Sequence, residues 1–203
     1  MSTLPESDEK IIEKKKDFKF YLKEAFFSFV WLAILLLIGD IVTKVVAMQY
    51  LKEGVSVPFI PGLLKWTLTY NKGAAWGMGG DATWSRILLI LISWGAMIGI
   101  LWYFIAKYKT LNKFMKACLM IILAGDVGNL IDRTFFYNRG VVDFLDITEL
   151  IPNFGIFNFA DSCLVVGLLM LVVYFIVEWI KELVTEAKAN RHSKDGNDNE
   201  SGK

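Results

Sequence analysis

Two aspartates stand on either side of the loop that leads into the last long apolar segment of the chain. Asp143 lies in the run Val141–Phe144, and Asp161 follows 18 residues later, three positions after Asn158. Carboxylates beside a membrane-spanning stretch are costly, so they indicate a functional site. If the two meet at one membrane face, one can activate water while the other supplies a proton, which is the chemistry of an aspartic protease.

Each aspartate also has a simpler explanation. Asp161 would fall in the first turn of a helix, where the helix dipole stabilises an acid by about 0.3–1 kcal/mol. Asp143 could be a solvated loop acid, which is the favoured interpretation of its neighbours Asp146 and Glu149. The residue pattern alone leaves both explanations open.

The elements that must position these acids are membrane helices. The chain has 203 residues, of which 55% are hydrophobic, and a mean hydropathy of +0.44, which is too apolar for an ordinary soluble domain. A span of about 30 Å of hydrocarbon needs about 20 helical residues. Four stretches are long enough: 26–48, 84–106, 116–137 and 158–180. We therefore predict an all-α integral membrane protein with four transmembrane helices.

The distribution of charge predicts the topology. Lysines crowd residues 10–23, the loop around 107–116 and the tail 181–194, whereas 49–83 and 138–157 are poorer in them. By the positive-inside rule both termini are cytoplasmic, and the two lysine-poor loops face outward. The net charge of +1 argues against a nucleic-acid partner.

Composition also divides the chain. Residues 1–24 form a charged cytoplasmic segment, 25–183 the four-helix membrane domain, and 184–203 a polar cytoplasmic tail that is expected to be disordered. The long outer loop should carry a small β-sheet, because Leu64–Tyr70 alternates apolar and polar residues. Pro58 and Pro61 make the preceding run an edge strand or a turn.

Two further groups of polar residues lie within the spans. Asp40 and Lys44 are spaced i, i+4 on one helix face and can neutralise each other, so a structural role is favoured over direct chemistry. Asp126, Asn129 and Arg133 are spaced along one face of the third span, which must point into the bundle or a wet cavity.

The third span also carries two glycines and an arginine, and the chain has two cysteines and one histidine. Gly125 and Gly128 allow close helix approach. Arg133 could pair with a distant carboxylate or bind a peptide carbonyl. Cys118 and Cys163 begin their spans at opposite faces, so no disulfide is expected. The chain's one histidine lies in the tail, and no metal or cofactor site is expected.

Five motifs occur in order over roughly residues 26–180, and together they resemble those of the bacterial lipoprotein signal peptidases, the type II signal peptidases. The motifs are DIVTK (40–44), NKGAAW (71–76), GNLIDR (128–133), VVDF (141–144) and FNFAD (157–161).

This resemblance implies an aspartic endopeptidase of the bacterial inner membrane that removes signal peptides before a diacylglyceryl-modified cysteine. Asp143 and Asp161 match the catalytic pair of the family. The resemblance implies peptide- and lipid-site or supporting roles for Asn71, Gly73, Asn129, Arg133, Asn158 and Ala160, and for the nearby pair Asp40 and Lys44. The implied partners are lipidated prolipoproteins, membrane lipids and inhibitory cyclic peptides of the globomycin type; we expect a monomer with its active site at the outer face.

Two residues depart from the family pattern, and two other functions stay open. Asp126 replaces a small apolar residue and could pair with Arg133 or Lys44 or be protonated, and Phe159 is bulkier than usual. A proton-coupled transporter could use Asp40, Asp126, Asp132 and Arg133 as a relay. Alternatively, the polar residues could hold together a structural subunit.

Overall fold

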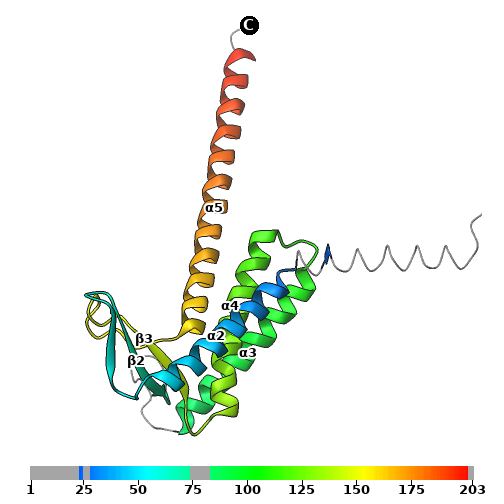
Figure 1. The fold of residues 1–203 in the computed structure, drawn as a ribbon. Coiled ribbons are helices and arrows are strands. Elements are labelled where there is room, and N and C mark those ends of the chain that lie inside the picture. The colour runs from blue at the N-terminus through cyan, green and yellow to red at the C-terminus, as the bar shows by residue number, and fades with distance from the viewer. Residues whose placement is uncertain (1–22, 25–27, 74–82, 201–203) are drawn as a thin grey trace, which may run out of the picture. The chain divides into compact units, whose positions relative to one another are not determined.

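The computed structural model describes residues 23–24, 28–73 and 83–200. In this part of the chain four helices are long and apolar enough to cross a membrane. They are α2 (Val30–Tyr50), α3 (Thr83–Lys107), α4 (Lys113–Phe135) and α5 (Phe159–Glu200). The predicted four-span membrane fold is confirmed (Figure 1).

Helix α4 is the central helix of the membrane domain. In its most apolar 18-residue stretch 61% of the residues are buried, against 17% or less in the corresponding stretches of the other three spans. Helix α4 packs against both α2 and α3 (Figure 1). Its first turn is capped by Asn112, whose side chain accepts a hydrogen bond of 2.8 Å from the Met115 amide. A buried central helix can carry polar residues that lipid would exclude.

Glycines on α4 allow α2 and the start of α5 to approach it closely. A Cβ atom at Gly125 would lie 2.5 Å from the Ala160 carbonyl oxygen. At Gly128 it would lie 2.6 Å from Oδ2 of Asp40. The expectation that these two glycines permit close packing is therefore confirmed, and three elements converge where the polar motifs lie.

A three-stranded antiparallel sheet accompanies the helices, in the order β1 (Ser56–Ile60), β2 (Leu64–Asn71) and β3 (Val141–Asp146). The strand predicted over Leu64–Tyr70 is β2, and Pro58 lies in the edge strand β1, as expected. Strand β3 was not predicted, since its residues are nearly all buried and do not alternate. It pairs with β2 across about 70 residues of sequence, with Thr69 opposite Asp143.

Strand β3 corrects two sequence interpretations. Asp143 and Asp146 are not solvated loop acids, because their residues are only 2% and 4% exposed. Glu149 is more accessible, as expected, and accepts a hydrogen bond from the Gly62 amide.

The chain divides into two compact units, Met1–Gly167 and Leu168–Lys203, with α5 contributing to both. Helix α5 continues to Glu200, beyond residue 183 where the membrane domain was predicted to end. The assignment of 1–24, 25–183 and 184–203 to separate regions stays a prediction, and residues 1–22 lie outside the described part of the chain.

Candidate active site

The first turn of α5 is fixed by reciprocal hydrogen bonds between Asn158 and Asp161. The Asp161 amide donates to Oδ1 of Asn158 at 2.9 Å, and the Asn158 amide donates to Oδ2 of Asp161 at 3.1 Å. This is the geometry of a capping box, with asparagine at the N-cap and the acid three residues later. The sequence FNFAD therefore places the Asp161 carboxylate at a defined position on the helix start.

Strand β3 brings Asp143 to the same place because the chain entering α5 pairs with it. Phe157 exchanges backbone hydrogen bonds of 2.8–3.0 Å with Leu145, and its carbonyl also accepts from the Phe144 amide. The side chain of the next residue, Asn158, donates from Nδ2 to Oδ1 of Asp143 at 2.7 Å. One buried asparagine thus contacts both aspartates.

Two more asparagines complete the hydrogen bonding of the pair. Asn129 on α4 donates from Nδ2 to Oδ1 of Asp161 at 2.7 Å, and its Oδ1 accepts from Asn158 at 3.0 Å. The Asn71 side chain hydrogen bonds to Asp143 and accepts from the Gly73 amide at 3.0 Å.

The two aspartates have different electrostatic surroundings. Burial raises the pKa of Asp143 to about 7, and the negative charge of Asp161 adds to this rise. Hydrogen bonds from Asn71 and Asn158 and the charge of Lys44 oppose it. A carboxyl group with a pKa near neutrality can hold or release a proton during a reaction. The two oxygens of Asp161 both accept hydrogen bonds, from the Asn129 side chain and from the Asn158 amide.

A buried ion-pair cluster lies beside the aspartates. Nζ of Lys44 is 2.7 Å from Oδ2 of Asp40 and 2.9 Å from Oδ2 of Asp132. The predicted pairing of Asp40 with Lys44 is therefore present. Asp40 also accepts a hydrogen bond of 2.9 Å from the Ala160 amide in the first turn of α5. The cluster is thus tied to the helix start that carries Asp161.

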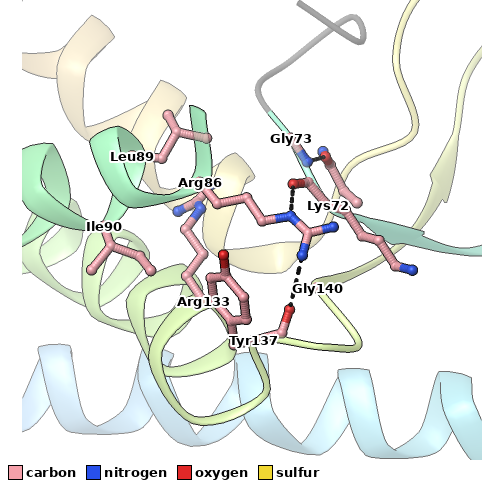
Figure 2. Close-up of a pocket in the computed structure, with 9 residues that line it drawn as sticks. Lys72, Gly73, Arg86, Leu89, Ile90, Arg133, Tyr137 and Gly140 are labelled. Atoms are coloured by element: carbon pink, nitrogen blue, oxygen red, sulfur yellow. Dashed lines mark hydrogen bonds between the residues drawn. The ribbon is translucent and has the colours of Figure 1, made fainter. Parts of the chain in front are cut away.

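A pocket of about 260 Å³, part of it open to solvent, adjoins the site (Figure 2). Arg86 and Arg133 enter it from α3 and α4, and Nε of Arg86 donates to the Lys72 carbonyl at 2.7 Å. Its walls combine cationic, apolar and glycine positions, namely Asn71, Lys72, Gly73, Arg86, Leu89, Ile90, Arg133, Tyr137 and Gly140. Such a surface can accept both a peptide backbone and an apolar group.

The structure brings most of the predicted site residues together. Hydrogen bonds or ion pairs connect Asp40, Lys44, Asn71, Asn129, Asp143, Asn158, Ala160 and Asp161, while Gly73 and Arg133 line the adjoining pocket. Asp126 does not join this group. It is hydrogen bonded to Ser93 on α3, and Lys44 pairs with Asp40 and Asp132 instead.

Sequence reasoning missed Asp132 and Arg139 as members of the site. Asp132 is buried between Lys44 and Arg139, with an Arg139 Nη2 to Asp132 Oδ1 distance of 3.0 Å. The signal available was spacing, since Asp132 lies three residues after Asn129 and four after Gly128 on α4. No comparable signal pointed to Arg139, which lies in the connection to β3. Cys118 and Cys163 are both buried free thiols.

Comparisons with known proteins agree with this site. The family described as Signal peptidase (SPase) II matches residues 32–177. The chain is 40% identical to the lipoprotein signal peptidase of Mycobacterium leprae (strain Br4923) over 162 residues, covering 78% of this chain and 76% of that protein. Its identity to the lipoprotein signal peptidase of Listeria monocytogenes serotype 4a (strain HCC23) is 35% over 153 residues, covering 75% of this chain and 94% of that protein.

A solved structure described as a bacterial membrane enzyme has the same fold. It superposes with a TM-score of 0.65 at 32% sequence identity, over 73% of this chain and 87% of that one. A second, with the same description, gives a TM-score of 0.62 at 33% identity over 72% of this chain and 90% of that one. The chain belongs to the signal peptidase II family, the lipoprotein signal peptidases, and is a membrane-bound aspartic protease.

Proposed function

We propose that the protein removes the signal peptide from diacylglyceryl-modified prolipoproteins, cleaving before the lipidated cysteine, with Asp143 and Asp161 as its catalytic pair. The observation that carries this proposal is that Asn158 hydrogen bonds to both aspartates, at 2.7 Å from Oδ1 of Asp143 and 3.1 Å from Oδ2 of Asp161. Both carboxyl groups are therefore within hydrogen-bonding distance of one residue although they come from different elements, which supports the proposal.

The surroundings of the two acids suggest their roles. Asp161 starts as the charged base, since Asn129 and the Asn158 amide donate to its two oxygens. Asp143 starts protonated, in keeping with a pKa of about 7 caused first by burial and then by the charge of Asp161. One proton shared between neighbouring acids is the arrangement that general acid–base hydrolysis needs.

The reaction then proceeds in two proton-balanced steps. In the first, Asp161 takes a proton from water as the hydroxide adds to the scissile carbonyl carbon, and Asp143 gives its proton to the carbonyl oxygen. In the second, Asp161 returns its proton to the leaving nitrogen as the C–N bond breaks, and Asp143 recovers a proton from a hydroxyl of the intermediate. The pair ends in its starting protonation state.

The adjoining pocket supports substrate binding next to the pair. Asn71 contacts Asp143 and also lines the pocket together with Gly73 and Arg133. The guanidinium of Arg133 is suited to a peptide carbonyl, while acyl chains would lie along the helices in lipid. Each buried CH₂ group contributes about 0.8 kcal/mol, which explains a preference for lipidated substrates.

The proposed setting is the bacterial inner membrane, with both termini cytoplasmic and the active site at the outer face. The lysine-rich segments expected on the cytoplasmic side support this orientation. Globomycin-type cyclic peptides are expected to inhibit the enzyme by occupying the peptide site, and a monomer contains all the residues of the proposed catalytic pair.

The test is cleavage of a lipidated prolipoprotein by the purified protein, with the unlipidated precursor as the comparison substrate. Asp143→Asn and Asp161→Asn should each abolish cleavage and leave the protein folded in detergent. Equal cleavage of the two precursors would contradict the lipid preference.

A matched control is available on the same strand. Asp146 is as buried as Asp143, but it contacts Thr67, Thr148 and Lys65 rather than the catalytic pair. Asp146→Asn should therefore retain cleavage per folded molecule. Normal processing by either Asp143→Asn or Asp161→Asn would show that the catalytic pair is wrongly assigned.

A further inference from the structure

The hydrogen bonding of the catalytic pair depends on which way the Asn129 side chain faces. In the structure its Nδ2 donates to Asp161 at 2.7 Å, while its Oδ1 accepts from Asn158 and lies 3.4 Å from Nζ of Lys44. The reversed amide would place Oδ1 against the carboxylate of Asp161 and Nδ2 against the ammonium of Lys44. Both contacts would be repulsive, so the ammonium selects the orientation that serves Asp161.

Lys44 can do this only if it stays charged and in place within the membrane domain. It is 4% exposed and also donates to the Gly128 carbonyl at 3.3 Å. Two carboxylates hold it, Asp40 at 2.7 Å and Asp132 at 2.9 Å. A buried ion that loses one of its partners is strongly destabilised, so each carboxylate contributes to its position.

Asp132 is itself held by Arg139. The Arg139 guanidinium lies 3.0 Å from Oδ1 of Asp132, 3.1 Å from the sulfur of Met48 and 4.2 Å from the Phe136 ring centre. Oδ2 of Asp132 also accepts a hydrogen bond of 3.4 Å from the amide of Val142, the residue before Asp143. Asp132 therefore contacts both Lys44, which adjoins the asparagine that donates to Asp161, and the strand that carries Asp143.

These contacts form one continuous network of alternating charge that ends at the catalytic pair. We propose that Asp132 and Arg139 are positioning residues for catalysis, which act through Lys44 to fix the Asn129 amide so that it donates to Asp161. The four charges of Asp40, Lys44, Asp132 and Arg139 sum to zero, so removing any one leaves a buried charge without its balance. This inference rests on the proposed function of Asp143 and Asp161.

The decisive variant is Arg139→Met, which removes the charge while keeping an unbranched side chain beside Met48 and Phe136. With the lipidated precursor, kcat should fall about 10- to 100-fold, the size of effect that misplaced catalytic groups produce. KM should stay within about twofold, since Arg139 is not among the residues that line the proposed substrate pocket. Arg139→Lys, which restores the cation, should recover most of the rate.

The dependence of kcat on pH separates positioning from a merely structural role. Without a reliable donor from Asn129, the charged form of the proposed catalytic pair loses a hydrogen bond, so the acidic limb of the profile should move to higher pH. The charged groups of the network and of the proposed catalytic pair come from four elements and the α4–β3 connection. They are Asp40, Lys44, Asp132, Arg139, Asp143 and Asp161. A fall in rate that only follows the folded fraction, with an unchanged profile, would overturn the inference.

A double variant tests whether Asp132 and Arg139 act through one network. The Asp132→Asn/Arg139→Met double variant should lose no more activity than the more damaging of its two single variants, because both changes interrupt one network. Additive losses would contradict the inference, and Arg139→Gln replaces Arg139→Met if the latter does not accumulate.

The matched control is Lys65→Met, which removes a cation from a separate ion-pair cluster with Asp146 and Glu149 on the same sheet. It should leave the pH profile unchanged. A wild-type protein that does not cleave the lipidated precursor contradicts the proposed function, whereas an active wild type with an unaltered Arg139→Met profile contradicts only the inference about the network.

Discussion

Two buried aspartates on strand β3 show how partners decide the chemistry of a residue. Burial raises the pKa of Asp143 to about 7, reinforced by the charge of Asp161. Burial also acts to raise the pKa of Asp146, but hydrogen bonds from Thr148 and Thr67 and the charge of Lys65 outweigh it, so that this pKa is lowered. Of these two aspartates, only Asp143 is therefore suited to carry a proton near neutral pH.

The pKa of Asp143 predicts the pH dependence of cleavage. Asp143 is protonated below about pH 7 and ionised above it, so a reaction that needs its proton should slow as the pH rises through this value. We expect kcat for the lipidated precursor to fall about tenfold for each pH unit well above the pKa. A rate that keeps rising between pH 7 and pH 9 would exclude Asp143 as the acid.

At the scale of elements, Asn158 both caps α5 and contacts the two proposed catalytic aspartates. Asn158→Ala removes the cap and the contact to Asp143, and should cost about 1 kcal/mol of stability as well as activity. Asn158→Ser keeps a capping oxygen but has no amide to donate to Asp143. We expect near-normal thermal stability but strongly reduced cleavage from the serine variant.

Comparison of melting temperature and kcat for these two variants distinguishes the roles of Asn158. If serine restores both stability and rate, the amide contact to Asp143 is dispensable, and Asn158 acts only as a helix cap.

The close approach of α4 and α5 gives a second prediction at this scale. A methyl group at Gly125 would lie 2.5 Å from the Ala160 carbonyl oxygen, so Gly125→Ala should destabilise the protein by about 1–3 kcal/mol and displace the start of α5. Gly95→Ala on α3 is the control, because a Cβ atom there meets nothing within 4 Å. Thermal unfolding in detergent should show a lower melting temperature for Gly125→Ala and an unchanged one for Gly95→Ala.

At the scale of the whole molecule, the proposed catalytic residues lie in the unit that ends at Gly167, and the family match ends at residue 177. The apolar part of α5 extends to Glu186. A chain truncated after Glu186 should therefore insert and cleave the lipidated precursor at a rate close to that of the full chain. Truncation after Gly167, which removes most of the last span, should abolish activity; loss of activity in the longer variant would assign a function to the tail.

Much of this arrangement could be predicted from the sequence. Long apolar runs predicted all four spans, and the spacing of Asp40 and Lys44 predicted their pairing, because both features are local to one helix. The resemblance to known motifs pointed to Asp143 and Asp161, which the structure joins through Asn158.

Features that depend on distant partners could not be predicted in this way. Strand β3 has no alternating pattern and forms only because β2 is available to pair with it. The contact of Asp132 with Arg139 depends on how the connection after α4 folds back, which no spacing rule describes. Asp126, grouped with Asn129 by helical spacing, instead reaches Ser93 on a neighbouring helix.

The order of these parts along the chain has a consequence for the cell that makes the protein. Asp161 sits at the entrance to the final span, and its hydrogen-bonding partners come from α4 and the residue just before α5. If Asp143 and Asp161 are the catalytic pair, a ribosome must therefore synthesise the chain as far as the start of the final span before the hydrolytic centre can form. Chains that end before the final span would then lack one of the two acids, so proteolytic activity would require that this last span be made.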